Sequence, residues 1–247
     1  MTASSVQADS LPRPRPRLSP PPLAIADGSL ELIKWVALVL MTLDHVNKYL
    51  LGAGQPWMFD LGRLVMPMFT AVLAVNLARP QARERGLYRR TLGRLLYFGT
   101  ITTPIFLAIG ATYRDTLWPL NILFLLASIV GCIWLIEIGG VRGWTGAAVV
   151  FLVGGMTAEY FWPGALFGIA VWFYARRPSW AAASVALLGC AGLYAVNGVW
   201  WSLAALPVLW LLPRLKLRLP RLRLAFYVYY PLHLAVIWLV QRAMAHW

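Results

Sequence analysis

The chain of 247 residues is 60% hydrophobic and carries only 9 acidic residues. A soluble domain has too small an interior to bury that much apolar surface, so the composition excludes an ordinary soluble protein and places the chain in a lipid bilayer. The formal net charge of +13 is high enough to suggest a nucleic-acid-binding protein. The basic residues, however, lie in short clusters between apolar runs. This pattern is typical of membrane topology, and we expect no nucleic-acid partner.

The first 28 residues cannot build a hydrophobic core. Proline and arginine alternate over residues 12–17, and three prolines follow at residues 20–22, a composition that favours extended polyproline conformations. The segment lacks the apolar centre of a cleavable signal peptide. We interpret residues 1–28 as a disordered, basic cytoplasmic tail that precedes a transmembrane domain of residues 29–247.

The rest of the chain divides into nine apolar stretches. A helix that crosses about 30 Å of hydrocarbon needs about 20 residues, although several of these stretches are shorter. The stretches cover residues 30–51, 57–78, 94–111, 119–137, 144–160, 162–175, 180–196, 199–213 and 224–241. Residues 144–175 are too long for one helix, and we divide them where Glu159, Pro163 and Gly164 interrupt the pattern. The predicted fold is all-α, a polytopic transmembrane helical bundle of about nine spans.

The distribution of lysine and arginine predicts how these spans are oriented. With the amino terminus in the cytoplasm and the spans alternating in direction, nearly all of the 22 basic residues fall on the cytoplasmic side. The exceptions are Lys48, Arg63, Arg114 and Arg242. We therefore expect a cytoplasmic amino terminus and an external carboxyl terminus.

Polar residues gather in the outer half of this predicted bundle. Asp44 and His45 lie within the first span, where inserting one ionisable side chain costs roughly 2.5–3.5 kcal/mol, so the pair needs a functional reason. His233 lies near the midplane of the last span. Further polar residues in or beside this depth range are Asn47, Lys48, Asp60, Arg63, Arg114, Asp115, Asn121, Glu159 and Asn197. We infer a polar cavity that opens to the outer face or lies just beneath it.

His45 is the candidate proton acceptor, because imidazole exchanges protons near neutral pH. The carboxylate that orients it is Asp44, Asp60 or Glu159, and the sequence does not choose among them. Asp44 has an alternative partner in Lys48, four residues later on the same helix. The alternative interpretation of His45 is a structural histidine that forms a hydrogen bond between helices.

Arg63 also has two interpretations. Asp60 precedes it by three residues, so the two side chains can neutralise each other as an ion pair. In the functional interpretation, Arg63 instead holds an anionic group such as a phosphate or a developing oxyanion. Gly62 permits close backbone approach, and Pro67 can bend the helix and free a carbonyl group.

The remaining polar and sulfur-containing residues are given structural interpretations. Asn121 and Asn197 lie at predicted helix starts and are most simply helix caps. Cys132 and Cys190 lie in apolar runs with no partner near them in sequence, so we expect neither a disulfide nor a metal site.

Several short motifs recur in a defined order along the chain. They are Leu32–Trp35, Leu43–Tyr49, Phe59–Leu64 with Pro67 and Phe69, Tyr88–Arg90, Trp118–Ile122, Glu159–Gly164 and Tyr229–His233. Through these motifs, about residues 30–240 resemble the TraX family of conjugative-pilus proteins, which is associated with N-terminal acetylation of pilin. That family is related to a wider group of multi-spanning membrane acyltransferases.

The resemblance implies an acyltransferase of the bacterial inner membrane. Its donor substrate would be acetyl-CoA, and its acceptor an amine or hydroxyl group of pilin or of an envelope glycan. In the wider group a first-span histidine is assigned as the catalytic base, which corresponds to His45, and an arginine near the next span corresponds to Arg63. We expect Asp44 or Asp60 to stabilise the imidazolium, and His233 to position the donor or relay the proton. The expected donor-binding residues are Arg63, Asn121 and Glu159.

Two other classes of function fit the same residues. A proton-coupled transporter would also place histidines and carboxylates at mid-depth. A non-catalytic membrane assembly factor would use its intramembrane charges only to join helices. The acyltransferase prediction carries a geometric difficulty, because acetyl-CoA is cytosolic and the polar groups lie in the outer half. Either a cavity reaches the cytoplasmic face, or the acyl group crosses the bilayer.

Overall fold

The computed structural model describes residues 20–23, 25–114, 116–215, 219, 222 and 224–245. Most of the predicted tail, namely residues 1–19 and 24, lies outside the described residues, and so does Asp115. Within the described ranges every regular element is a helix, and the β-type pairing is limited to a single bridge between Leu120 and Ala158. The predicted all-α class is confirmed.

The helices follow the predicted apolar stretches in order, with short 3₁₀ helices labelled η. They are α1 Asp27–Tyr49, α2 Pro56–Gly62, α3 Val65–Leu77, α4 Leu87–Ala108, α5 Ile122–Ile138, α6 Gly140–Thr157, α7 Phe161–Arg176, α8 Trp180–Gly192, α9 Tyr194–Asn197, η1 Trp200–Ala204, α10 Ala205–Leu211, η2 Leu212–Arg214 and α11 Ala225–Met244. Each predicted stretch coincides with one helix or with a short series of helices. The predicted division near Glu159 falls between α6 and α7.

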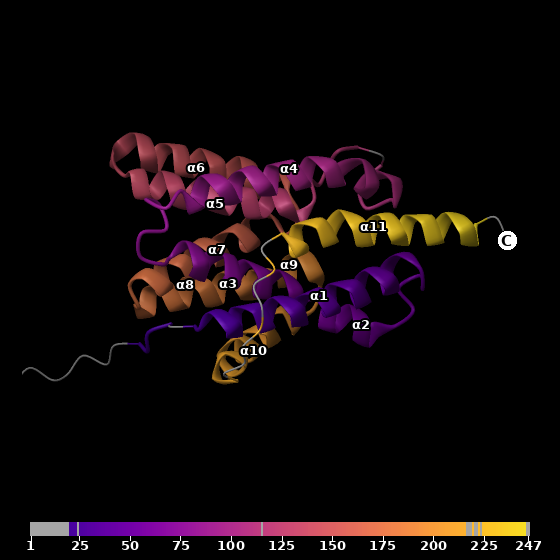
Figure 1. Cartoon of the computed structure of the whole chain (residues 1–247), viewed down its shortest axis with the longest axis horizontal. Coiled ribbons are helices and arrows are strands. Elements are labelled where there is room, and N and C mark those ends of the chain that lie inside the picture. Colours follow the sequence, from indigo (N-terminus) through magenta and orange to yellow (C-terminus); the bar gives the residue numbers. More distant parts are fainter. Residues whose placement is uncertain are drawn as a thin grey trace, which may run out of the picture.

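Most of the long helices lie roughly along the long axis of the molecule (Figure 1). The connection from α3 to α4 and the turn from α5 to α6 lie toward the end where the described chain begins. The connection from α1 to α2 and the carboxyl end of α11 lie toward the opposite end. Consecutive long helices therefore alternate in direction.

Some of the helices have the properties of membrane spans. Within the described residues, two helical stretches are long and apolar enough to cross a membrane, Pro56–Leu77 and Trp180–Asn197, while Ile122–Ile138 is apolar but shorter. On α6 and α8, large apolar side chains are exposed, including Leu152 at 58% and Leu188 at 66%. Exposed apolar faces of this kind mark a surface that meets lipid or another protein. The nine-span topology and the orientation of the termini stay predictions.

The centre of the bundle is α3, which packs against α1, α5, α7 and α10. Met66 and Met68 are fully buried there. Small residues on α7 allow this close packing, because a Cβ atom at Gly168 would come within 2.7 Å of both Thr70 on α3 and Ile129 on α5. A tightly packed α3 gives the neighbouring α1 and α2 a fixed position.

The predicted second stretch is interrupted between α2 and α3, at Arg63 and Leu64. Pro67 explains the interruption, because proline has no N–H and cannot donate to the carbonyl of Arg63 four residues earlier. The regular pattern resumes with Met68, whose N–H donates to the carbonyl of Leu64 at 3.1 Å. The predicted effect of Pro67 is confirmed, and the interruption places Arg63 at the end of α2.

The segment before α5 pairs with the turn between α6 and α7. The N–H of Leu120 donates to the carbonyl of Thr157 at 2.8 Å, and the N–H of Glu159 donates to the carbonyl of Leu120 at 2.9 Å. Tyr160 and Phe161 then take left-handed φ values of 64° and 48°. This pairing holds Glu159 beside the first turn of α5.

Candidate active site

Asp44 of α1 and Arg63 at the end of α2 form an ion pair inside the bundle. Nη2 of Arg63 lies 2.7 Å from Oδ1 and 2.6 Å from Oδ2 of Asp44. The two side chains are only 12% and 11% exposed. Gly62 permits this approach, because a Cβ atom on it would overlap the side chain of Asp44. The glycine predicted to allow close approach does so, and the group that approaches is Asp44.

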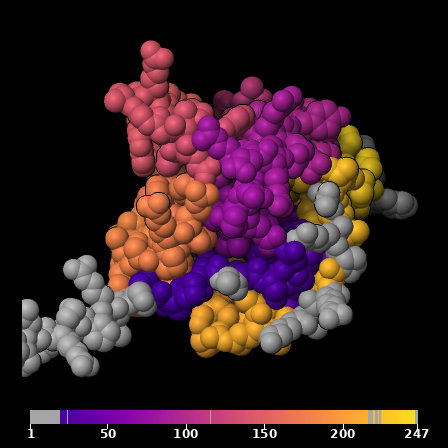
Figure 2. All heavy atoms as spheres, turned by 60° about the vertical axis from the view of Figure 1, so that its left-hand side comes forward, coloured from indigo at the N-terminus to yellow at the C-terminus, as the bar shows by residue number. Residues whose placement is uncertain are grey.

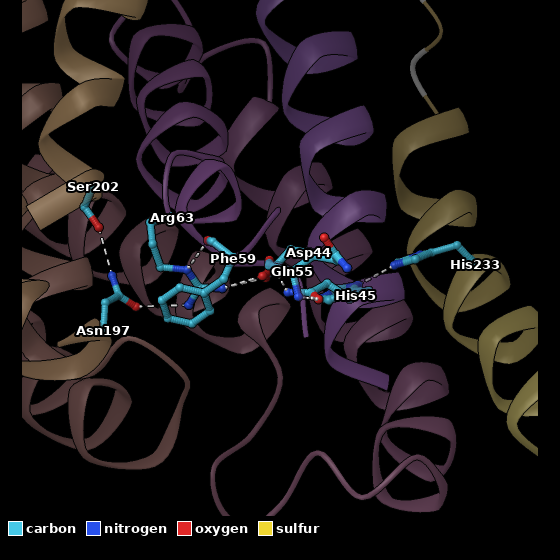
Figure 3. Close-up of polar contacts among 9 residues, drawn as sticks. Asp44, His45, Gln55, Phe59, Arg63, Asn197, Ser202 and His233 are labelled. Atoms are coloured by element: carbon cyan, nitrogen blue, oxygen red, sulfur yellow. Dashed lines mark hydrogen bonds and ion pairs between the residues drawn. The ribbon is translucent and has the colours of Figure 1, made fainter. Parts of the chain in front are cut away.

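The rest of the Arg63 guanidinium is also engaged. Its Nε donates to the carbonyl of Phe59 at 3.1 Å, and its Nη1 donates to Oδ1 of Asn197 at 3.2 Å. Asn197 in turn donates to the hydroxyl of Ser202 at 2.8 Å. Figure 3 shows these contacts extending from α1 through α2 to α9 and η1. An arginine has five N–H groups, so these bonds leave one N–H on Nη1 for any further acceptor.

The structure contradicts two of the alternatives left open for these residues and one expectation. Arg63 pairs with Asp44, and Asp60 forms no ion pair or side-chain hydrogen bond within the described chain. Asp44 likewise pairs with Arg63, while the exposed Lys48 lies over the ring of Tyr49. Asn197 ends α9 and is no helix-start cap, since α9 closes at that residue. In each case a partner distant in sequence replaces a near neighbour.

On another side of α1, His45 contacts His233 of α11. Nδ1 of His45 lies 2.7 Å from Nε2 of His233, and the two rings are nearly parallel, at 7°. Nδ1 of His233 lies 2.9 Å from the carbonyl oxygen of Tyr229. The two histidines that the sequence places at membrane depth therefore meet directly, and Figure 3 shows their side chains pointing toward each other.

This chain of contacts fixes the tautomer of both neutral rings. A carbonyl oxygen can only accept, so Nδ1 of His233 carries a proton and donates it to Tyr229. Nε2 of His233 is then the acceptor, and Nδ1 of His45 must be the donor. The lone pair of His45 is left on Nε2, which receives no hydrogen bond from the described residues. This nitrogen is therefore the ring atom of His45 that can accept a proton.

Tyr229 and Thr42 support the histidine pair, and the sequence reasoning did not single out either one as functional. Thr42 donates to the carbonyl of Leu38 at 2.8 Å, so the tyrosine hydroxyl, 2.7 Å away, donates to Thr42. The ring of Tyr229 lies nearly parallel to His233, at 8°. Helical spacing could have identified them, because Tyr229 lies four residues before His233 and Thr42 lies three residues before His45, which puts each on the same helix face as its histidine.

Within the described residues, no carboxylate orients His45. None of the three acidic candidates, Asp44, Asp60 and Glu159, forms a hydrogen bond with His45 in the described structure, and the orienting group is the imidazole of His233. Adjacent positions on a helix differ by about 100°, so Asp44 and His45 face different neighbours. The expectation of a carboxylate partner was wrong, and the expected proximity of His233 to the site is confirmed.

Glu159 lies in the turn between α6 and α7, outside the helices. Its Oε2 accepts a hydrogen bond from the N–H of Ile122 at 3.0 Å. Burial raises the pKa of Glu159 to about 7, although the charges of Lys48 and Arg63 and the bond from Ile122 act to lower it. Arg63 and Asp44 are both among the charges that act on Glu159, so Glu159 interacts electrostatically with the Asp44–Arg63 pair.

The side chain of Asn121 caps α5 and joins it to α4. It is 1% exposed, accepts from the N–H of Leu123 at 3.2 Å, and donates to the carbonyl of Gly99 at 2.9 Å. The predicted cap is confirmed, and the side chain also joins α5 to α4. A donor-binding role for Asn121 stays a prediction.

Comparison with known proteins supports the family resemblance that the sequence motifs indicated. The family model described as TraX protein matches residues 29–241, which is most of the chain. The chain belongs to the TraX family. Protein TraX of Escherichia coli is 30% identical over 171 residues, which cover 68% of this chain and 64% of that protein. Protein TraX of Escherichia coli strain K12 is 47% identical over 57 residues, 23% of each chain.

The match thus spans slightly less than two thirds of the first TraX relative. No solved structure matches this chain. The TraX relationship and the apolar helices Pro56–Leu77 and Trp180–Asn197 together indicate a membrane protein.

Proposed function

We propose that this TraX-family protein is a multi-pass acyltransferase of the bacterial inner membrane. It transfers an acetyl group from acetyl-CoA to an amine or hydroxyl acceptor, either the amino terminus of a pilin or an envelope glycan. The observation that carries the proposal is the free Nε2 of His45, held in place by the bond from its Nδ1 to His233. A base of this kind is what an acyl acceptor needs, because its attacking atom must lose a proton.

In the proposed reaction, the acceptor nitrogen or oxygen attacks the thioester carbonyl while its proton moves to Nε2 of His45. The carbonyl oxygen becomes an oxyanion in a tetrahedral intermediate. As the intermediate collapses, the bond from carbon to sulfur breaks, and the imidazolium returns the proton to the departing thiolate. The products are the acylated acceptor and free coenzyme A, and no further reactant is needed.

His233 acts as a positioning residue in this scheme. Its Nε2 accepts the bond from His45 both before and after His45 takes a proton, so the bond strengthens as positive charge develops. The bond from His233 to the carbonyl of Tyr229 keeps that acceptor nitrogen unprotonated. In this scheme His233 stabilises the imidazolium, a role expected from the sequence for Asp44 or Asp60.

Arg63 and Asp44 have a narrower role than the motifs suggested. The guanidinium is occupied by Asp44, Phe59 and Asn197, so it is mainly a support that fixes α1 against α2. The one remaining N–H on Nη1 is available to an oxyanion.

The test follows an acetyl label from donor to acceptor. Purified protein in lipid nanodiscs is incubated with labelled acetyl-CoA and a membrane extract, and labelled product and released coenzyme A are measured together. Loss of a general base typically costs about 10²–10⁴-fold in rate, so His45→Ala should lose transfer to that extent. Val39→Ala is the matched control, because Val39 lies on the exposed face of the same helix. Full activity in a folded His45→Ala variant would overturn the proposal.

A further inference from the structure

A cavity of about 760 Å³ lies between α1, α3, α4, α5 and α11, and the residues named above as the site do not line it. Its size falls in the range of small-molecule sites, roughly 300–1,000 Å³. The connection between α3 and α4 also borders it, at the end of the molecule that Figure 2 turns toward the viewer. This is the end that the lysine and arginine distribution predicts to be cytoplasmic.

One end of the cavity is strongly basic. Its cations are Lys34, Arg79, Arg85, Arg90 and Arg94, and its anions are Asp27 and Glu31. The two anions are paired, Glu31 with Lys34 at 2.7 Å and Asp27 with Arg79. Within the described chain, the other three arginines form no ion pair.

Arg90 and Arg94 are placed to act together. They are four residues apart on the first turns of α4, so they share one face of that helix. Leu87 and Thr91 from the same face also line the cavity. A pair of unpaired guanidinium groups at the rim of a cavity is suited to bind phosphate groups.

The opposite end of the cavity approaches the candidate active site, although His45 and His233 do not line it. Met41, on α1, lines it and lies one turn before His45 on the same face of the helix. Tyr230 also lines it, and its ring centroid is 5.7 Å from that of His233. Ile122 lines it as well, and its N–H is the group that Glu159 binds.

The walls between the two ends are apolar. Leu38, Val65, Phe69, Val72, Leu123 and Leu126 face the cavity. Along α1, the distance from Asp27 to Met41 is about 21 Å, at 1.5 Å per residue. The cavity therefore suits a ligand with an anionic phosphate head and a long uncharged arm.

We propose that this cavity is the binding site for the acyl donor, a coenzyme A thioester. Its phosphates bind at Arg90 and Arg94, and its acyl arm lies along the apolar walls toward Tyr230. The proposal rests on the acyltransferase function. It gives a cytosolic donor a path through the bundle toward His45, so the donor itself need not cross the bilayer. An anionic phospholipid has the same general chemistry, and the experiment separates the two.

The first experiment measures binding to the purified full chain in nanodiscs of zwitterionic lipid by isothermal titration calorimetry. The probes are acetyl-CoA and its head fragment, adenosine 3′,5′-bisphosphate. Losing two charge-assisted hydrogen-bonding partners should weaken the binding of both probes by at least about tenfold in Arg90→Ala/Arg94→Ala. Arg142→Ala is the matched control, because Arg142 is an exposed arginine outside the cavity.

A second variant, Leu123→Trp, fills the apolar part of the cavity. It should weaken acetyl-CoA binding while leaving the affinity for the head fragment within about twofold of wild type. Thermal unfolding of each variant shows whether the fold is retained. If either fails to fold, Arg90→Gln/Arg94→Gln and Leu126→Phe take its place.

The outcomes distinguish this site from the function on which it rests. Wild-type affinity for both probes in the arginine variant overturns the donor site, whereas loss of transfer in His45→Ala still supports the acyltransferase. Failure of wild type to bind acetyl-CoA or to transfer its acetyl group overturns both. If anionic phospholipid added to the nanodiscs binds through Arg90 and Arg94 and acetyl-CoA does not bind, the cavity is a lipid site and the donor assignment is wrong.

Discussion

Two neighbouring residues of α1 illustrate opposite uses of a polar group inside the bundle. Asp44 is closed, because both its carboxylate oxygens contact Arg63 and that arginine is held by two further partners. His45 is open, because within the described residues only its Nδ1 is hydrogen-bonded and its Nε2 has no partner. A closed pair holds helices together, whereas an open, oriented base is available for chemistry. The four predictions below test whether stability and activity divide along this line.

The largest expected effect is on the closed side. Arg63→Ala leaves the carboxylate of Asp44 buried and unpaired, which typically costs about 3–5 kcal/mol of stability. The double variant Asp44→Asn/Arg63→Gln removes both charges and should be more stable than Arg63→Ala. Denaturant unfolding in detergent of wild type, Asp44→Asn, Arg63→Gln and the double variant measures the double-mutant cycle. Additive losses in the cycle would mean that the two residues do not act as a pair.

On the open side, His233→Phe should change activity more than stability. It keeps an aromatic ring between Tyr229 and Tyr230 but removes the acceptor for Nδ1 of His45. Partners that orient a functional histidine typically contribute about 10–100-fold to activity, and we expect a kcat decrease in that range with a smaller change in KM. The pH profile of kcat should also shift, because the imidazolium loses its acceptor. An unchanged pH profile of kcat would mean that His233 contributes only to packing.

The approach of α2 to α1 should depend on Gly62. In Gly62→Ala the new methyl group overlaps Asp44, and such overpacking typically costs about 1–3 kcal/mol. Gly93→Ala is the control, because a Cβ atom at Gly93 meets nothing within 4 Å and the residue lies inside α4. Thermal unfolding of both variants should show a clear loss for the first and none for the second. Equal midpoints would show that α1 and α2 can separate freely.

The smallest effect concerns pH. The raised pKa of Glu159, about 7, means that the folded protein binds a proton more tightly than the unfolded chain. Its contribution to stability is present below the unfolded pKa of about 4.3 and is lost as the pH rises toward 7. Glu159→Gln should therefore lose less stability than wild type between pH 5 and pH 8. Parallel melting curves for the two proteins over this range would contradict the shift.

Much of this arrangement could be predicted from the sequence because it depends on local signals. Hydrophobic length gave the order of the helices, Pro67 marked the interruption in the second stretch, and the apolar context of His45 and His233 placed both histidines at the site. Asn121 was recognised as a cap because capping is determined by the residues that follow it.

The pairings between distant residues could not be predicted in the same way. In sequence, Lys48 was a plausible partner for Asp44 and Asp60 for Arg63, but within the described residues Asp44 and Arg63 pair with each other. The choice of Arg63 depends on the turn between α1 and α2 and on the missing side chain at Gly62. The bond from Arg63 to Asn197 joins residues 134 positions apart, and only the packed bundle brings them together.

The position of His45 on α1 also limits how the family can vary in length. Met41 at the end of the cavity and His45 are one helical turn apart, and Asp44 faces Arg63 from the adjacent position. Inserting a single residue between Lys34 and Met41 would rotate everything after it by about 100° and advance it by about 1.5 Å. Asp44 would then face the direction that His45 faces now, and His45 would turn away from His233. Natural variation in this segment of α1 should therefore consist of substitutions, while insertions and deletions accumulate in the connections.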